Sequence, residues 1–322
     1  MAGPEALNVH AASHGADPGA FRAWTAGAAS AAAYGFGPTI AALAYAGGVT
    51  PVTLATLRGL AGSLVLGLAM SCGMLRGLPR RAVLGTVLIG GPLYGAQLLF
   101  YFAAIQRIGA QTAVVLVHVY PLLVVTLLWL RTRQAVGREM AALLACVVFG
   151  VALVAGTGAR GLTGAGVTFA FGSAFAYALY VVLGESWIRK LNPLAAGGLV
   201  TLGATMTTGA VAVLSGQSLR VSGSAWVPIL LQGLLVIPVG LGGAFVALKF
   251  LGPVSASLLA MLEPVVGVVV AGLFLGERLA PLQWAGAAVV VLACGILPLI
   301  QERSRGSVSH AGDCVYPRTA VR

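Results

Sequence analysis

Two charged residues lie inside long apolar stretches of the sequence, and they are the side chains best suited to chemistry. Glu263 interrupts one such stretch and is followed at once by Pro264, and Arg58 interrupts another. A charge at such depth in a bilayer is costly, so it is usually found facing a cavity or a partner. A carboxylate can bind an amine or a proton, and a guanidinium can hold a carboxylate or phosphate through its forked donors.

Each charge also has a purely structural interpretation. Glu263 could bind backbone groups that Pro264 leaves unpaired, because proline has no N–H to donate. Arg58 could extend its long side chain to the outer headgroups. If both residues instead face one cavity, together they suit a zwitterion such as an amino acid. This combination is the basis of our substrate hypothesis.

Weaker polar candidates occur elsewhere in the apolar stretches. Tyr94, Gln97 and Tyr101 are three and four residues apart, which places them on one face of a helix. We expect this polar stripe to face the interior of a helix bundle, where it either lines a cavity or makes interhelical hydrogen bonds. His118 lies within the next apolar stretch. It is a candidate proton relay, or else a hydrogen-bonded spacer.

The composition indicates that a membrane surrounds these residues. The chain has 322 residues, of which 59% are hydrophobic and 8% charged, whereas soluble domains contain roughly 25% charged residues. The net charge of +11 does not indicate a nucleic-acid partner, because the basic residues lie in short loops and at helix ends, where membrane lipid accounts for them. The four cysteines form no CxxC motif or Cys/His cluster, so no disulfide framework or metal site is expected.

Ten apolar stretches are long enough to cross a bilayer as helices. They cover residues 24–46, 52–75, 82–104, 110–130, 138–156, 164–187, 194–216, 227–249, 254–275 and 281–300, with the weakest breaks at Pro51, 105–109 and 250–253. If the N-terminus is cytoplasmic, fourteen of the 19 Lys and Arg residues lie on the inner side and four on the outer side. This asymmetry predicts that both termini are cytoplasmic. We expect residues 1–20 to be disordered and residues 301–322 to form a cytoplasmic tail.

The second half of the chain repeats the first at an offset of 143 residues. The matching pairs include Ser30 with Ser173, Tyr34 with Tyr177, Gly37 with Tyr180, Gly109 with Gly252, Tyr120 with Glu263 and Pro121 with Pro264, and Thr50-Pro51 matches Asn192-Pro193 after a slip of one residue. Five spans map onto five, so the second copy must be inserted upside down. Inverted repeats are typical of secondary transporters, whose substrate site lies near the midplane. We therefore expect the matched tyrosines to line a pathway and the matched prolines to mark helix breaks.

These features resemble the EamA type of the drug/metabolite transporter superfamily over about residues 24–300. The motifs that carry the resemblance are Glu263-Pro264-Val265, Phe274-Leu275-Gly276-Glu277, Gln283 with Gly286, Tyr120-Pro121-Leu122, and Thr50-Pro51 with Leu57-Arg58. The resemblance implies an all-α integral membrane protein with ten transmembrane helices in two inverted five-helix repeats, here residues 21–157 and 158–300. One departure is Arg133-Gln134, which stands where the second repeat has Gly-Glu.

We predict a secondary active transporter of small metabolites in the bacterial plasma membrane. The working hypothesis is an exporter of amino acids or related compounds by proton-coupled alternating access. Its partners would be the small-molecule substrate, membrane lipid and protons, with no cofactor. No GxxxxGK[ST] run for ATP binding is present, so a gradient or exchange must supply the energy.

Several alternatives remain open. The superfamily also includes carriers of drugs, sugars and nucleotide-type metabolites that work by exchange or uptake, and a homodimer is compatible with the sequence. An intramembrane lipid-modifying enzyme would need several acids, metal ligands or an activated nucleophile close together. A channel would need a ring of charges or carbonyls. The duplicated sequence favours a carrier over both, so we expect no enzymatic activity.

Overall fold

The computed structural model describes residues 18–70, 77–133, 138–156, 162–188, 190–260, 262–275 and most of 280–296. Within these ranges the chain is helical apart from short connections and has no strand, which confirms the all-α prediction. Helix α1 begins at Pro18, inside the segment 1–20 that we expected to be disordered. Residues 1–17 and the predicted tail lie outside the described ranges.

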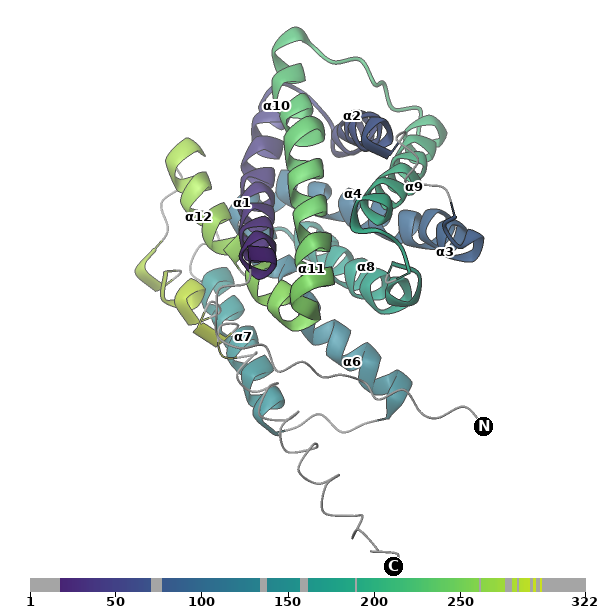
Figure 1. Ribbon diagram of the computed structural model, residues 1–322. Helices are drawn as coiled ribbons and strands as arrows, with labels where there is room; N and C mark the ends of the chain where they lie inside the picture. Colours follow the sequence, from purple (N-terminus) through teal and green to yellow (C-terminus); the bar gives the residue numbers. More distant parts are fainter. Residues whose placement is uncertain are drawn as a thin grey trace, which may run out of the picture.

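The order of helices follows the predicted repeat (Figure 1). The first half contains α1 (Pro18–Ala46), α2 (Pro51–Met70), α3 (Arg80–Gly85), the π-helical turn η1 (Thr86–Gly90), α4 (Gly91–Ile108), α5 (Ala110–Val117), α6 (Tyr120–Thr132) and α7 (Arg138–Gly156). The second half contains α8 (Gly164–Ile188), α9 (Pro193–Leu214), the short 3₁₀ turn η2 (Gly223–Ala225), α10 (Trp226–Leu231), the π-helical turn η3 (Gln232–Val236), α11 (Ile237–Ala260) and α12 (Leu262–Leu275).

Six helical segments among the described residues are long and apolar enough to cross a membrane. The other predicted spans correspond to α1, to α7, to α12 with the end of α11, and to helical residues between 281 and 296. Helix α2 illustrates how these helices are oriented. Leu60, Leu64 and Leu68 are exposed on one face at a spacing of four, whereas Arg58 is buried on the inner side. The apolar faces therefore suit lipid and the polar groups lie inside the bundle.

The second helix of each half begins with the same capping chemistry. The Thr50 Oγ1 accepts a hydrogen bond from the backbone N–H of Thr53 at 3.2 Å, and the Asn192 Oδ1 accepts one from Leu194 at 3.0 Å. A proline follows each cap at the first helical position, where its missing N–H leaves no hydrogen bond unmade. The one-residue slip noted in the sequence thus joins two equivalent helix starts.

The predicted helix breaks are realised differently in the two halves. Gly109 has φ of 79° and separates α4 from α5, within the predicted break at 105–109. The predicted break at 250–253 is not where a helix ends, because α11 continues to Ala260. The chain still bends inside α11: Ala247 and Leu259 both have atoms within 3.0 Å of the position of a Cβ built on Gly27. A straight helix would separate these two residues by about 18 Å.

Reciprocal hydrogen bonds relate the two halves. The hydroxyl of Ser30 in α1 donates to the carbonyl of Gly240 in α11, and that of Ser173 in α8 donates to the carbonyl of Gln97 in α4 at 3.1 Å. Both residues of one bond are 143 positions from their counterparts in the other. Figure 1 shows α1 alongside α11, and α4 packs along α8 in the equivalent way. Each half therefore supplies the neighbour that the other half's helices need.

Glycines permit close crossings between the halves. A Cβ on Gly203 of α9 would lie 2.4 Å from the backbone oxygen of Val87, and one on Gly91 would lie 2.5 Å from the Cα of Gly203. At the equivalent crossing, a Cβ on Gly233 would lie 2.6 Å from the carbonyl oxygen of Arg58. Small residues at such positions let helices approach closely in lipid.

The α4–α9 crossing leads to a stability prediction. Gly203→Ala should lower the free energy of unfolding by about 1–3 kcal/mol, and with it the melting temperature, because the added methyl group meets backbone atoms that cannot rotate away. Fluorescence-detected gel filtration of heated detergent extracts would measure the loss. Gly242→Ala in α11 is the matched control, since no described residue outside its own helical turn has an atom within 4 Å of its Cβ position. Equal losses for the two variants would contradict the close crossing.

Candidate functional site

A small cavity lies where α2, α4, α9 and α11 meet. Its volume is about 10 Å³ measured to the centre of a water molecule, which is room for about one water. Two pairs of lining residues are 143 positions apart: Tyr94 with Ile237, and Leu98 with Leu241. The cavity therefore lies between equivalent positions of the two halves, where inverted-repeat transporters bind their substrates.

Arg58 is the charged group of this cavity. Its residue surface is only 4% exposed, and its Nη1 donates to the Oε1 of Gln232 at 2.7 Å. The guanidinium carbon lies 4.9 Å from the ring centre of Phe102, in a cation–π contact. The alternative that Arg58 extends to the headgroups is therefore wrong. Its Nε–H has no acceptor within the part of the chain that the structure describes.

Gln232 holds Arg58 in place, and the sequence analysis overlooked it. The side chain is fully buried at the start of η3, and its Nε2 donates to the carbonyl of Gly37 in α1. It thereby connects α1, α2 and η3. A signal was available in the sequence, because Gln232 is the only strongly polar side chain between residues 227 and 248. A lone amide within a membrane span needs hydrogen-bond partners.

Two threonines of α9 also line the cavity, and the sequence analysis missed them as well. The hydroxyl of Thr201 donates to the carbonyl of Gly197 at 2.8 Å, and that of Thr205 donates to the carbonyl of Thr201 at 2.7 Å. Each hydroxyl proton is used within the helix, and the Thr205 oxygen also lies 3.2 Å from the Ser63 Oγ, so Thr201 keeps the more available acceptor oxygen. The cavity thus offers donors from Arg58 and acceptors from α9.

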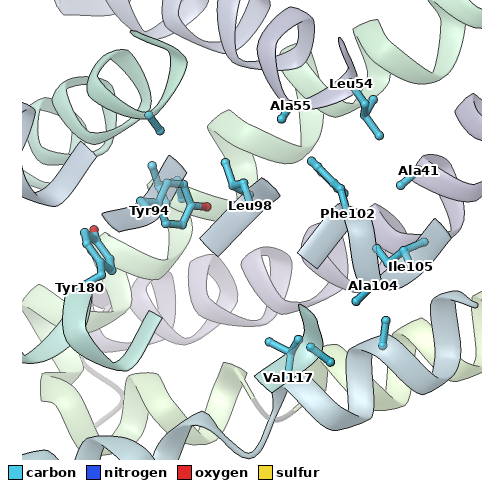
Figure 2. Packing of buried hydrophobic residues seen from close by; sticks show 14 of the residues in the cluster. Ala41, Leu54, Ala55, Tyr94, Leu98, Phe102, Ala104, Ile105, Val117 and Tyr180 are labelled. Atoms are coloured by element: carbon cyan, nitrogen blue, oxygen red, sulfur yellow. The ribbon is translucent and has the colours of Figure 1, made fainter. Parts of the chain in front are cut away.

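Four tyrosines form a row that leads away from the cavity. Ring centres are 5.4 Å apart from Tyr94 to Tyr180, 5.9 Å from Tyr180 to Tyr177, and 4.7 Å from Tyr177 to Tyr120. Figure 2 shows the first two near each other, on α4 and α8. The ring of Tyr120 lies 6.0 Å from that of His118. This tyrosine row joins the Arg58 region to His118.

Tyr34 and Tyr101 complete the set of predicted tyrosines. Tyr34 of α1 interacts with Tyr94 and with Arg58. Tyr101 lies within electrostatic range of both Arg58 and Glu263, and its buried hydroxyl has no hydrogen-bond partner among the described residues. Both residues therefore belong to the charged interior of the bundle.

Gln97 has a different environment from the tyrosines of its stripe. Its side-chain Nε2 donates to the Oγ of Ser173 at 3.2 Å, and its backbone carbonyl accepts from the same hydroxyl at 3.1 Å. Gln97 therefore makes the interhelical hydrogen bond that we weighed against cavity lining, and it does not contact the cavity.

Glu263 and His118 form the second titratable cluster. The Glu263 Oε2 lies 3.8 Å from the His118 Nε2, and the side chains are 21% and 5% exposed. The Nδ1 of His118 lies 2.7 Å from the carbonyl oxygen of Val114. Because a carbonyl can only accept, Nδ1 carries a proton and Nε2 is the nitrogen that can exchange one with Glu263. The separation is longer than a hydrogen bond, so transfer requires a small movement or a bridging water.

The matched prolines lie in first turns of helices. Pro121 is the second residue of α6, and Pro264 is the third residue of α12. A missing N–H in a first turn breaks no helical hydrogen bond. His118 and Val119 form a non-helical connection before α6, which places the interruption beside Glu263. Met261, which precedes α12, lies outside the described residues.

Comparison with known proteins identifies the family. Residues 22–156 and 164–298 both match the EamA-like transporter family. The chain belongs to this family. EamA-like proteins are membrane transporters of small molecules, and the two matched segments have the predicted two-repeat arrangement.

One solved crystal structure resembles this EamA-like chain with a TM-score of 0.64 and 20% sequence identity, over 87% of this chain and 98% of the other. At that identity the likeness concerns the fold alone. A search of curated proteins gives no significant match.

Apolar side chains flank the cavity of this EamA-like transporter at equivalent positions. Leu98 and Phe102 of α4 face Leu54 and Ala55 of α2 (Figure 2). In the second half, Leu241 and Phe245 of α11 come within 3.4 and 3.5 Å of a Cβ position on Gly197. With the predicted topology, the first contact lies toward the outer face and the second toward the inner face.

Cross-linking can test whether these contacts close opposite sides. In a variant without the native cysteines, a short bifunctional thiol reagent should stop transport when it joins Ala55→Cys to Leu98→Cys, or Gly197→Cys to Leu241→Cys. A membrane-impermeant thiol reagent should then reach Tyr94→Cys only from the cytoplasmic side in the first case and only from the outside in the second. Access from the same side in both cases would show that the two contacts do not close opposite sides of the carrier.

Proposed function

We propose that this EamA-like transporter exports amino acids or related small zwitterions by proton-coupled alternating access. The observation that carries the proposal is the Glu263–His118 pair, 3.8 Å apart inside the helix bundle. The proposed location is a bacterial plasma membrane with both termini cytoplasmic, which the distribution of Lys and Arg supports. The two inverted five-helix repeats that we propose cover residues 21–157 and 158–300.

The Glu263–His118 pair can hold one proton in two ways. A protonated Glu263 can face the neutral Nε2 of His118, or a carboxylate can face an imidazolium. The bond between Nδ1 and Val114 keeps the imidazole ring oriented in both forms. Because an uncompensated charge in hydrocarbon is costly, binding a proton makes it easier for the carrier to reorient. Proton binding and transport are thereby linked.

Arg58 supplies the opposite charge on the same pathway. Tyr94 and Tyr101 of α4 each lie within electrostatic range of both Arg58 and Glu263. A zwitterion could therefore place its carboxylate near Arg58 and its ammonium toward the α9 hydroxyls or Glu263. Protons moving inward down the gradient of the plasma membrane would then drive the substrate outward.

Sealed inside-out vesicles with an imposed pH gradient can test the coupling. An acidic interior should drive the uptake of a ¹⁴C-labelled mixture of L-amino acids into vesicles that contain the protein. One proton per substrate and a gradient of two pH units would permit at most about 100-fold accumulation, since each unit corresponds to about a factor of ten.

Glu263→Gln should abolish this accumulation and leave only exchange of labelled for unlabelled substrate. Glu139→Gln is the matched control, because Glu139 is an exposed carboxylate at the start of α7. Uptake that ignores the pH gradient in the wild type and in Glu263→Gln alike would refute proton coupling.

A further inference from the structure

Arg58 is a buried cation with no counter-ion in the described part of the chain. Among the described residues, His118 and Glu263 form an ion pair within 4.0 Å, and no carboxylate lies that close to Arg58. The residues that interact with Arg58 electrostatically are neutral tyrosines. Its Nε–H lacks an acceptor among the described residues, although Arg58 lines the cavity. An unpaired buried charge is strongly destabilising, so Arg58 is suited to bind an anion from outside the chain.

Gln232 occupies the place that such an anion would take. Its carboxamide has the shape of a carboxylate in which one oxygen is replaced by a neutral donor. The oxygen lies on the Nη1 of Arg58 at 2.7 Å, and the nitrogen is occupied with the carbonyl of Gly37. A true carboxylate can bind a guanidinium through two oxygens, in hydrogen bonds roughly twice as strong as neutral ones. A ligand carboxylate can therefore displace the amide oxygen.

We propose that Gln232 is an internal surrogate for a substrate carboxylate. It holds Arg58 while the site is empty and releases it when the substrate's carboxylate binds. This inference rests on the proposed function, because it assigns one chemical group to the substrate. A carboxylate matches the charge better than a phosphate, since Arg58 is the single fixed cation among the described residues that line the cavity, whereas a phosphate group carries a charge of about −1.5 to −2.

The replacement of Gln232 by a substrate carboxylate on Arg58 would take place where the two halves meet. Arg58 and Gly37 belong to the first repeat and Gln232 to the second, so its two hydrogen bonds tie the repeats together. Alternating access rearranges this boundary. Gln232 also begins the π-helical turn η3, a form that occurs mostly as single turns and frequently at functional sites. Binding of a carboxylate would thus remove one tie between the repeats.

Two substitutions at this position have opposite expected effects. Gln232→Glu keeps the shape of the side chain but places a permanent carboxylate beside Arg58. It should compete with the substrate and raise the apparent KM for the labelled L-amino acid mixture about tenfold or more, as expected when a charge-assisted hydrogen bond is blocked. Gln232→Met removes the acceptor without adding charge. It should lower the apparent KM and reduce the maximal rate, because the empty carrier must then reorient with an unpaired Arg58.

The direction of the KM shifts separates this role from a structural one. Gel filtration would first establish that both variants fold. Opposite shifts in KM support the surrogate, and a loss of maximal rate in both variants with unchanged KM overturns it. In the wild type, unlabelled amino acids should compete with the label while their amides, which lack the carboxylate, should not. Equal competition by the amides would also overturn it.

A second measurement keeps the inference testable if the wild type takes up no label, which would refute the proposed function alone. Sodium formate, the smallest carboxylate, should raise the melting temperature of the full-length wild type in lipid nanodiscs relative to sodium chloride at equal ionic strength. Gln232→Glu should show no such shift. The same response in both proteins would refute the surrogate role.

Discussion

The hydrogen bond between Arg58 and Gln232 is the interaction on which the interior of this transporter depends. A guanidinium buried in hydrocarbon must have its donors satisfied, and here an amide from the other repeat satisfies one of them. That amide is in turn fixed by the backbone of α1. The ring of Phe102 covers one face of the cation. Three helices and a π-helical turn must therefore meet at one depth, and the glycine crossings let them approach closely enough.

The scaffold is nearly symmetric, whereas its chemistry is not. Contacts that support the bundle occur twice, as in Ser30 with Ser173 and Leu98 with Leu241. The charged groups occur once. Glu263 matches Tyr120 and Arg58 matches Thr201 at the repeat offset. Each repeat thus keeps the packing that alternating access requires, while one copy of each site carries the charge.

Much of this arrangement could be predicted from the sequence, because the lipid environment forces simple patterns. The helical spacing of Tyr94 with Tyr101 and of Tyr177 with Tyr180 survives in the structure, within α4 and α8. Gln232 and Thr201 were missed, because their roles depend on which helices meet, and spacing along one helix does not reveal that. No helix ends at the predicted break at 250–253, because equivalent glycines need not adopt equivalent backbones. Gly109 has a positive φ, whereas α11 remains helical past Gly252.

The reciprocal serine hydrogen bonds also bear on how the protein is made. The spans of the first half are synthesised before α8 and α11, so the carbonyl of Gln97 and the hydroxyl of Ser30 lack their final partners during that time. Water or lipid headgroups cannot replace these partners deep in the bilayer. The early helices must therefore wait in a loose association, and the native bundle closes only once translation of the later ones is complete.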